Sequence, residues 1–378
     1  MNLRHITNFD YVLFLAVISL SVIGILFIYS SGINSDGISV SHEYIKQLIW
    51  VVSGLILLFA VAVYDYTKIA DRALLVYMIT MLLLVYTRLF GKTVKGARSW
   101  IGIGDFGIQV SEFTKIIYIV FLAWYLSRSQ NEPEFRRFIK AAVIMFIPMG
   151  LILLQPDLGT ASVYLPIFLI MCFIAGFPLR YVFGLLGTTV CTLVFTLLPL
   201  WERTILRRSS LAVKVLGNKN ITLLIIFSVV GAGVIAAIGY LLLKKRYYYW
   251  IGYVFSIVAI ALSGALVGSR VLKDYQMKRL IIFLDPNSDP LGAGWHILQS
   301  MTAIGSGGRA GLGFLKGTQS HYRFLPEQST DFIFSILSEE WGFLGGLLVF
   351  VLYAIIFLRM FLIIKKTNDL FGKLIVSG

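Results

Sequence analysis

The sequence predicts an all-α protein that crosses a membrane about ten times and carries one large extracytoplasmic loop. Hydrophobic residues make up 58% of its 378 residues, charged residues only 14%, and the mean hydropathy is +0.84. Soluble domains carry about 25% charged residues, so the surroundings of most of this chain are expected to be lipid. Its apolar runs lack the two-residue alternation of barrel strands, which indicates spanning helices.

Ten apolar runs approach or reach the roughly 20 residues that cross a bilayer. They cover residues 11–29, 48–63, 73–86, 113–126, 141–154, 160–177, 181–200, 221–243, 249–267 and 341–358. The first run is too long, and too closely followed by the next, to be a cleaved signal, so we expect it to stay in the mature protein. Cys172 and Cys191 lie inside apolar runs, which indicates packing residues.

The distribution of basic residues predicts a cytoplasmic N-terminus. The loops then placed inside carry Arg4, Lys68, Arg72, Arg128, Arg136, Arg137, Lys140, Lys244, Lys245, Arg246, Arg359, Lys365 and Lys366. Two outward loops are also basic, with Arg88, Lys92, Lys95 and Arg98 in one and Arg203, Arg207, Arg208 and Lys214 in the other. Those cations either bind an anionic ligand or merely solvate loop ends.

The net charge of +14 suits an anionic lipid surface. Nucleic acid is a poor candidate, because the cations are spread over short loops and do not gather on one soluble face.

Residues 284–334 form the one long polar, glycine-rich segment, which we call the insert, and it is where chemistry is expected. Its glycines at 305–313 superficially match a dinucleotide fingerprint, but no strand–helix unit surrounds them. We therefore expect them to permit tight turns and close backbone approach, or to offer N–H groups to an anion. The four histidines are scattered without metal-ligand spacing, so no metal site is predicted.

Three stretches, in order, carry a family resemblance. They are KGARSW at 95–100 leading to QVSEFTK at 109–115, QPDLGT at 155–160, and the insert with DPLGAGWHILQS at 289–300, AIGSGG at 303–308, GTQS at 317–320, FLPE at 324–327 and TDFIF at 330–334. The chain resembles the shape, elongation, division and sporulation (SEDS) family. The LGAG and GTQS motifs are similar to those of the rod-elongation branch of that family.

The resemblance implies one SEDS-type transmembrane domain over residues 1–378, with an extracytoplasmic catalytic loop at about 268–331. It implies a peptidoglycan glycosyltransferase in the bacterial cytoplasmic membrane that polymerises lipid II during cell elongation. The implied partners are a class B penicillin-binding transpeptidase and other elongation-complex membrane proteins. It leaves open whether Mg²⁺ or Mn²⁺ assists the leaving pyrophosphate.

By the DPLGAG match, the family's essential aspartate falls on Asp289. A carboxylate within reach of an acceptor sugar hydroxyl can act as general base, an effect worth about 10² to 10⁴ in rate. Asp285 competes for this role, but it follows Phe283 and Leu284 and could simply cap a turn. We prefer Asp289, because the glycines after it could let a bulky sugar approach the backbone.

The undecaprenyl pyrophosphate that leaves needs positive charge. The outward cations nearest the matched motifs are Lys95, Arg98, Lys316 and Arg323, of which Arg98 and Arg323 are preferred. Trp100 offers a ring face to a sugar or lipid, or equally anchors its helix at the membrane interface.

Other acidic residues have structural alternatives. Glu112 and Lys115 are spaced i, i+3 at the start of a helix, so we expect them to pair, as a structural ion pair or as part of a cavity lining. Asp157 either faces the substrate cavity or caps its turn. Most of the acids at the far end of the insert are expected to orient loops or helix ends; they are Glu327, Asp331, Glu339 and Glu340.

The chain departs from the family in two places. Two extra apolar segments, within residues 221–267, precede DYQMKR at 274–279, and adding a pair keeps the insert on the outer side. The chain also stops as another helix begins with LFGKLI at 370–375, so we expect C-terminal helices of the family to be missing. A lipid II flippase, or a non-catalytic scaffold for the transpeptidase, remains an alternative function.

Overall fold

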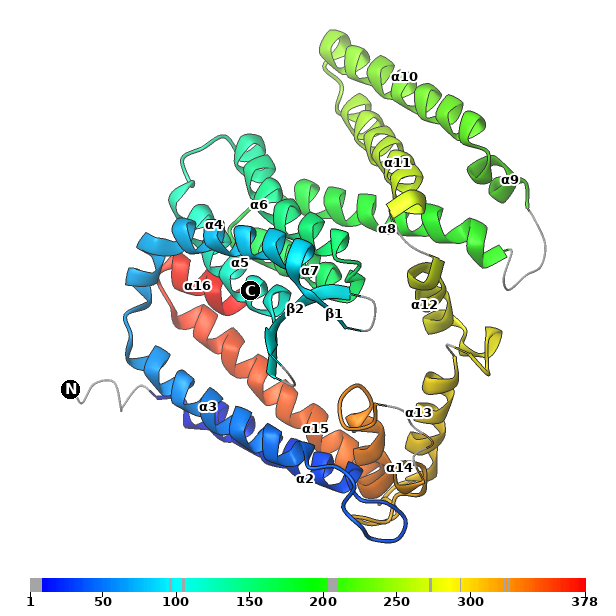
Figure 1. Cartoon of the computed structure of the whole chain (residues 1–378). Helices are drawn as coiled ribbons and strands as arrows, with labels where there is room; N and C mark the ends of the chain where they lie inside the picture. Colours follow the sequence, from blue (N-terminus) through cyan, green and yellow to red (C-terminus); the bar gives the residue numbers. More distant parts are fainter. Residues whose placement is uncertain are drawn as a thin grey trace. The chain divides into compact units, whose positions relative to one another are not determined.

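The computed structural model describes residues 9–94, 97–103, 106–202, 210–271, 274–292, 294–322, 324 and 327–378 (Figure 1). Within those residues, nine helices are long and apolar enough to cross a membrane, and one further apolar helix, α7, is shorter. The chain is a multi-pass membrane protein whose candidate spans, in the described residues, are all helical, as its sequence predicts.

Each predicted apolar run lies in or overlaps one of these ten helices. These helices are α2 (Tyr11–Ser31), α3 (Glu43–Val63), α4 (Tyr66–Phe90), α5 (Val110–Arg128), α6 (Glu134–Leu154), α7 (Leu158–Ile174), α8 (Leu179–Trp201), α10 (Lys219–Leu243), α11 (Arg246–Val271) and α15 (Ile333–Lys366). Most of these helices extend past the apolar run into polar residues at one or both ends.

Shorter elements lie between these helices. They are β1 (Lys92–Val94), β2 (Ala97–Ile103), β3 (Phe106–Gln109), α9 (Leu211–Gly217), α12 (Asp274–Leu284), the 3₁₀ turn η2 (Pro286–Ser288), α13 (Trp295–Ser306), α14 (Thr318–His321) and α16 (Leu370–Ser377). Helix α16 begins at Leu370, where the sequence predicts the start of a further helix. The sheet was not predicted.

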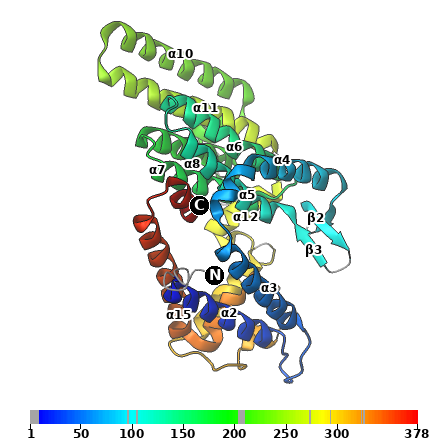
Figure 2. The ribbon, with the colours of Figure 1, turned by 90° about the vertical axis from the view of Figure 1, so that its left-hand side faces the viewer.

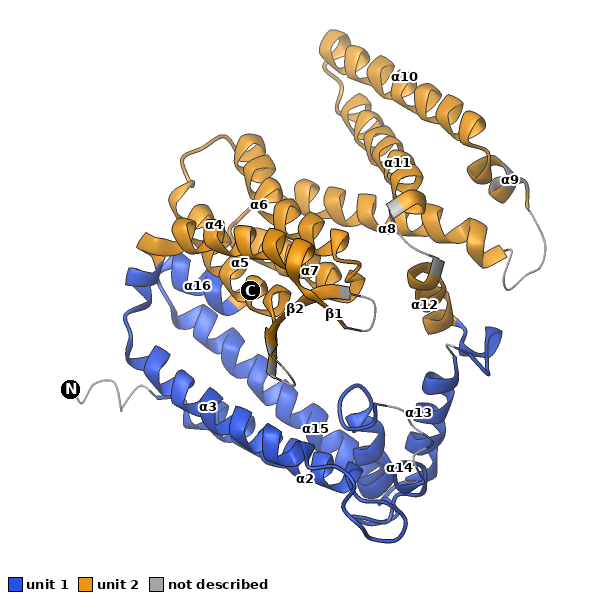
Figure 3. Ribbon diagram, in the orientation of Figure 1, with its two compact units in different colours: residues 1–69, 285–376 blue, residues 70–284, 377–378 orange. Residues whose placement is uncertain are grey.

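The chain divides into two compact units (Figure 3). Unit 1 contains residues 1–69 and 285–376, and unit 2 contains residues 70–284 and 377–378. Unit 1 therefore holds the predicted catalytic aspartate, whereas unit 2 holds the other two stretches of the family resemblance.

In unit 1, helix α2 packs along α15 (Figure 2). Phe27 of α2 is fully buried, and its ring meets the Trp341 ring edge to face with centroids 4.9 Å apart. Ile336 and Leu337 complete this cluster. The carboxylate of Asp10, which caps α2, also accepts a bifurcated hydrogen bond from the Nε–H of Arg359, with Nε 3.0 Å from Oδ1 and 2.7 Å from Oδ2.

Helix α15 is kinked at Gly342, whose φ of 65° is a left-handed conformation. The glycine-rich loop of the insert packs backbone to backbone against this kink. Leu312 N and Gly313 N donate to the carbonyls of Glu339 and Glu340, both at 3.0 Å. At Gly311, which has φ +82°, a Cβ would lie 2.0 Å from the Glu340 carbonyl oxygen. The loop glycines therefore serve close backbone approach, one of the two roles that the sequence predicts for them.

In unit 2, the antiparallel strands β1, β2 and β3 connect α4 to α5. Trp100 of β2 pairs with Lys92 on one side and Gln109 on the other. Buried Gln155 joins the end of α6 to α4, because its Nε2 donates to Leu84 O and Thr87 Oγ1, both at 2.9 Å. These contacts fix the turn 155–158 that begins α7.

The two extra apolar segments form the antiparallel pair α10 and α11, which also packs on α8 through α11. Gly264 of α11 lies against Thr192, where a Cβ would be 3.0 Å from the threonine Cγ2. The Tyr253 hydroxyl donates to the carbonyl of Arg180 at 2.6 Å.

Candidate active site

Asp289 stands in a tight turn in unit 1, directly after η2. Its backbone carbonyl accepts hydrogen bonds from Gly292 N at 3.3 Å and Gly294 N at 3.0 Å. A Cβ on Gly294 would lie 2.2 Å from the Pro286 carbonyl oxygen, and one on Gly292 would lie 2.4 Å from Oδ2 of Asp289. Glycine at both positions therefore lets the turn close, and the Asp289 residue is left exposed.

Asp285 has the alternative role that its sequence context suggests. It caps η2, with Oδ1 accepting from Asn287 N at 3.2 Å. Beyond Asp289, Leu291 is 89% exposed, the largest value among the exposed large hydrophobic residues that the structure describes. The turn thus presents an acid and an apolar side chain together.

The second half of the insert is held by two buried acids of α15. The carboxylate of Glu339 accepts from Thr318 Oγ1 at 3.0 Å, Gln319 N at 2.7 Å and Ser320 N at 3.3 Å, and so caps α14. Glu340 accepts from Leu315 N at 3.1 Å and from the Ser30 hydroxyl. Both acids orient the loop, as expected for this end of the insert.

Unit 2 contains a cavity of about 610 Å³ that is lined by both polar and apolar residues. Its walls come from the sheet, the start of α7, and α12; the lining includes Ser99, Trp100, Gln109, Asp157, Ser162, Tyr275, Gln276 and Arg279. Two predicted substrate-binding residues, Trp100 and Asp157, therefore line one cavity. We call this space the polar cavity.

A chain of hydrogen bonds extends from the wall of the polar cavity to the start of α5. Asp157 caps α7 through Thr160 N at 3.1 Å, accepts from Thr160 Oγ1 at 2.8 Å, and accepts from Gln109 Nε2 at 2.9 Å. The Thr160 hydroxyl also lies 3.4 Å from Oε1 of Glu112. Glu112 pairs in turn with Lys115, whose Nζ is 2.8 Å from Oε2. The i, i+3 ion pair predicted from sequence is formed, and it adjoins the cap of α7.

The remaining predicted cations are placed differently. Arg98 is exposed, is not among the residues that line the polar cavity, and donates from Nη1 to the Leu89 carbonyl at 3.3 Å. Lys316, in unit 1, is exposed on the loop before α14. Lys95 and Arg323 lie outside the described residues.

No group of three His, Cys, Asp or Glu residues with metal-binding proximity is found within the described ranges.

Comparison with known proteins decides the family. The model of the FtsW/RodA/SpoVE family, described as cell cycle proteins, matches residues 11–211 and 210–378. This chain belongs to that family. The three stretches of the family resemblance, the insert among them, all lie within the matched residues.

Several family relatives align with nearly the whole chain. Peptidoglycan glycosyltransferase RodA of Treponema pallidum is 57% identical over 378 residues, covering 100% of this chain and 87% of the relative. Stage V sporulation protein E of Bacillus subtilis is 31% identical, covering 98% of this chain and 83% of the relative. Peptidoglycan glycosyltransferase MrdB of Escherichia coli is 29% identical, covering 98% and 80%. The alignment with the T. pallidum relative runs through the extra pair α10 and α11.

Solved structures share the family fold. One, described as the structural coordination of polymerization and crosslinking by a peptidoglycan synthase complex, has a TM-score of 0.65 at 23% identity and covers 98% of this chain and 82% of the other. The crystal structure of Thermus thermophilus rod shape determining protein RodA has a TM-score of 0.56 at 19% identity, covering 98% and 80%.

Sequence reasoning missed part of the polar cavity. Tyr275, Gln276 and Arg279 of α12 line it, and the Arg279 guanidinium lies 5.8 Å from the Tyr275 ring centroid. In the sequence, residues 274–279 stand out only as the DYQMKR stretch that follows the two extra apolar segments. The i, i+4 spacing of Tyr275 and Arg279 was the available signal, because it puts both side chains on one helical face.

Proposed function

We propose that this chain polymerises lipid II into glycan strands at the outer face of the bacterial cytoplasmic membrane, during cell elongation. The activity class, peptidoglycan glycosyltransferase, rests on the 57% identity of the whole chain with the T. pallidum enzyme of that name. That full-length identity is the observation that carries the proposal.

Asp289 is the general base in this proposal. The acceptor hydroxyl gives its proton to the Asp289 carboxylate as its oxygen bonds to the anomeric carbon of the donor, and the bond from that carbon to undecaprenyl pyrophosphate breaks. Support comes from the turn, which exposes Asp289 while Asp285 is engaged in capping η2. Leu291, exposed beside the acid, suits the apolar part of a lipid-linked substrate.

Positive charge stabilises the departing pyrophosphate. Arg98, Lys95, Lys316 and Arg323 keep this proposed role, and Arg279 is added to them because it lines the polar cavity together with Trp100 and Asp157. In that cavity, Trp100 provides a ring face and Arg279 a guanidinium fork, which matches phosphate oxygens in pairs. Asp157 accepts three hydrogen bonds from protein groups, which favours a positioning role for it over proton transfer.

The proposed partners are a class B penicillin-binding transpeptidase and other membrane proteins of the elongation complex. A fold shared with a protein from a peptidoglycan synthase complex supports this assignment.

The test uses the purified chain in liposomes, with lipid II already on the outer face. The proposal expects glycan chains from the unaltered protein and none from Asp289→Ala. Equal polymerisation by both proteins would remove the assignment of the base. Movement of labelled lipid II between leaflets without polymer would favour the flippase, and transpeptidase binding with neither activity would favour the scaffold.

A further inference from the structure

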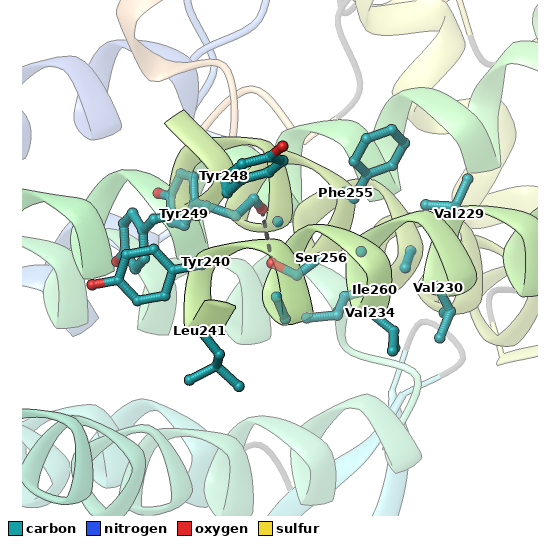
Figure 4. A pocket seen from close by; sticks show the side chains of 15 residues that line it. Val229, Val230, Val234, Tyr240, Leu241, Tyr248, Tyr249, Phe255, Ser256 and Ile260 are labelled. Carbon is teal, nitrogen blue, oxygen red and sulfur yellow. Dashed lines mark hydrogen bonds between the residues drawn. The ribbon is translucent and has the colours of Figure 1, made fainter. Parts of the chain in front are cut away.

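An apolar groove of about 670 Å³ lies between α10 and α11, near the turn that joins them (Figure 4). It is lined by the C-terminal half of α10 and the N-terminal half of α11. Aliphatic side chains such as Val230 and Val234 line the end away from the turn, and Tyr240, Tyr248 and Tyr249 lie at the end toward the turn. None of its lining residues belongs to the polar cavity or to the Asp289 turn.

Small residues both bring the two helices together and leave this space empty. A Cβ on Gly252 would be in ordinary van der Waals contact with the Ala236 Cβ, at 3.8 Å, whereas a Cβ on Gly239 would lie only 3.0 Å from the Tyr248 ring. Beside these contacts, Ala237 and Ala259 line the groove with single methyl groups. The groove thus results from a helix pair that touches at its small residues and is unfilled between them.

The turn above the groove carries three cations. Lys244 ends α10 in a left-handed conformation, with φ 51°, and Lys245 and Arg246 follow. All three residues are exposed, and in the described part of the chain none of them forms an ion pair. A tyrosine-lined apolar groove with cations at one end has the two parts of a lipid-binding site. The cations suit a charged headgroup, and the apolar groove suits an acyl chain.

We propose that this groove binds one anionic diacyl phospholipid, with an acyl chain in the groove and the phosphate at the turn 244–246. The cations complement a negative headgroup, and the tyrosine rings suit the depth where headgroup and chain meet. The volume also fits a lipid chain better than a partner helix, since a spanning helix about 30 Å long and 10 Å wide occupies on the order of 2,400 Å³. The site goes beyond the proposed catalytic function and does not depend on it.

The test is native mass spectrometry of the full-length chain released from detergent, after titration with dioleoyl phosphatidylglycerol or dioleoyl phosphatidylcholine. We expect one retained phosphatidylglycerol per chain, held more tightly than phosphatidylcholine. Lys245→Gln/Arg246→Gln leaves the cap of α10 intact and removes two cations, each worth about fivefold near an anionic headgroup, so the affinity should fall about 25-fold. The matched control is Lys365→Gln/Lys366→Gln, which removes two exposed cations at the end of α15 and should leave the retained lipid unchanged.

A second pair of variants tests the acyl end. Ala237→Phe places a ring in the groove from an exposed position and should abolish retention of the lipid, whereas Ile238→Phe, one residue along and outside the groove, should not. Helix content by circular dichroism and a single elution peak check each fold. Equal retention of both lipids, or equal loss in variants and controls, would overturn the proposal, as would unaltered binding by Lys245→Gln/Arg246→Gln.

Discussion

Gln109 Nε2 donates a hydrogen bond of 2.9 Å to Oδ2 of Asp157, and so ties the last residue of β3 to the cap of α7. The same carboxylate accepts from the backbone and the hydroxyl of Thr160. Asp157 therefore shapes the wall of the polar cavity through three hydrogen bonds from two residues.

The first prediction distinguishes the contribution of the α7 cap to stability from that of the Gln109 hydrogen bond. Asp157→Ala should lower the free energy of unfolding by about 0.5–2 kcal/mol, because α7 loses its N-cap. Gln109→Ala keeps the cap and should cost about 0.5–1.5 kcal/mol. Thermal unfolding in detergent measures both, with the exposed Gln130→Ala as a control expected to change little. An Asp157→Ala protein as stable as the control would contradict the capping role.

The second prediction concerns the ion pair between Glu112 and Lys115. Neutralising one partner leaves the other charge unpaired near the start of a spanning helix. The losses of unfolding free energy caused by Glu112→Gln and by Lys115→Gln should therefore add up to more than the loss caused by the double variant. A double-mutant cycle should give a coupling energy of about 1 kcal/mol. The more exposed pair Arg128 and Asp71, with side chains 60% and 74% exposed, serves as control and should give a coupling near zero. Equal coupling energies in the two pairs would show that the position of Glu112 and Lys115 at the start of a spanning helix does not strengthen their interaction.

The third prediction is a pH dependence at the start of α2. The hydrogen bond from Arg359 lowers the pKa of Asp10 below its ordinary value of 3.8. Because the pKa is lower in the folded state, the stabilisation is present above about pH 4 and is lost as the pH falls through the folded pKa. Asp10→Asn keeps an N-cap but removes the charge, so it should cost about 0.5–1 kcal/mol at pH 7 for a partly exposed pair.

Thermal unfolding of the two proteins from pH 7 to pH 3 measures this difference. The gap between them should narrow below about pH 4. A gap that is constant over the whole range would mean that the carboxylate charge of Asp10 does not contribute.

The fourth prediction tests the packing of the glycine-rich loop on α15. Gly311→Ala forces a Cβ to within 2.0 Å of the Glu340 carbonyl oxygen at a φ of +82°, so it should destabilise the protein by about 1–3 kcal/mol or more. Gly305→Ala is the matched control, because Gly305 lies in α13 with nothing within 4 Å of its Cβ position. That change should be neutral or stabilising by about 0.5–1 kcal/mol. Similar unfolding temperatures for the two variants would contradict the close contact.

Much of this molecule follows from its sequence, because the requirement for long apolar helices in lipid is strict. All ten apolar runs correspond to helices, and the pair of Glu112 with Lys115 follows from helical spacing. The small sheet was missed, since β1–β3 lie in a short, basic segment without clear alternation. Arg279 was missed because its place in the polar cavity depends on how α12 packs against the sheet and α7, which is set by tertiary contacts.

The contribution of Asp289 is tested most directly by the initial rate of glycan formation from lipid II by two isosteric variants prepared in the same way. Asp289→Asn removes the proposed base while keeping the shape of the turn, and its rate should fall by about 10² to 10⁴. Asp285→Asn keeps an oxygen that can cap η2, and its rate should stay within about threefold of the unaltered protein. Equal rates for the two variants, or a larger loss at Asp285, would contradict the account.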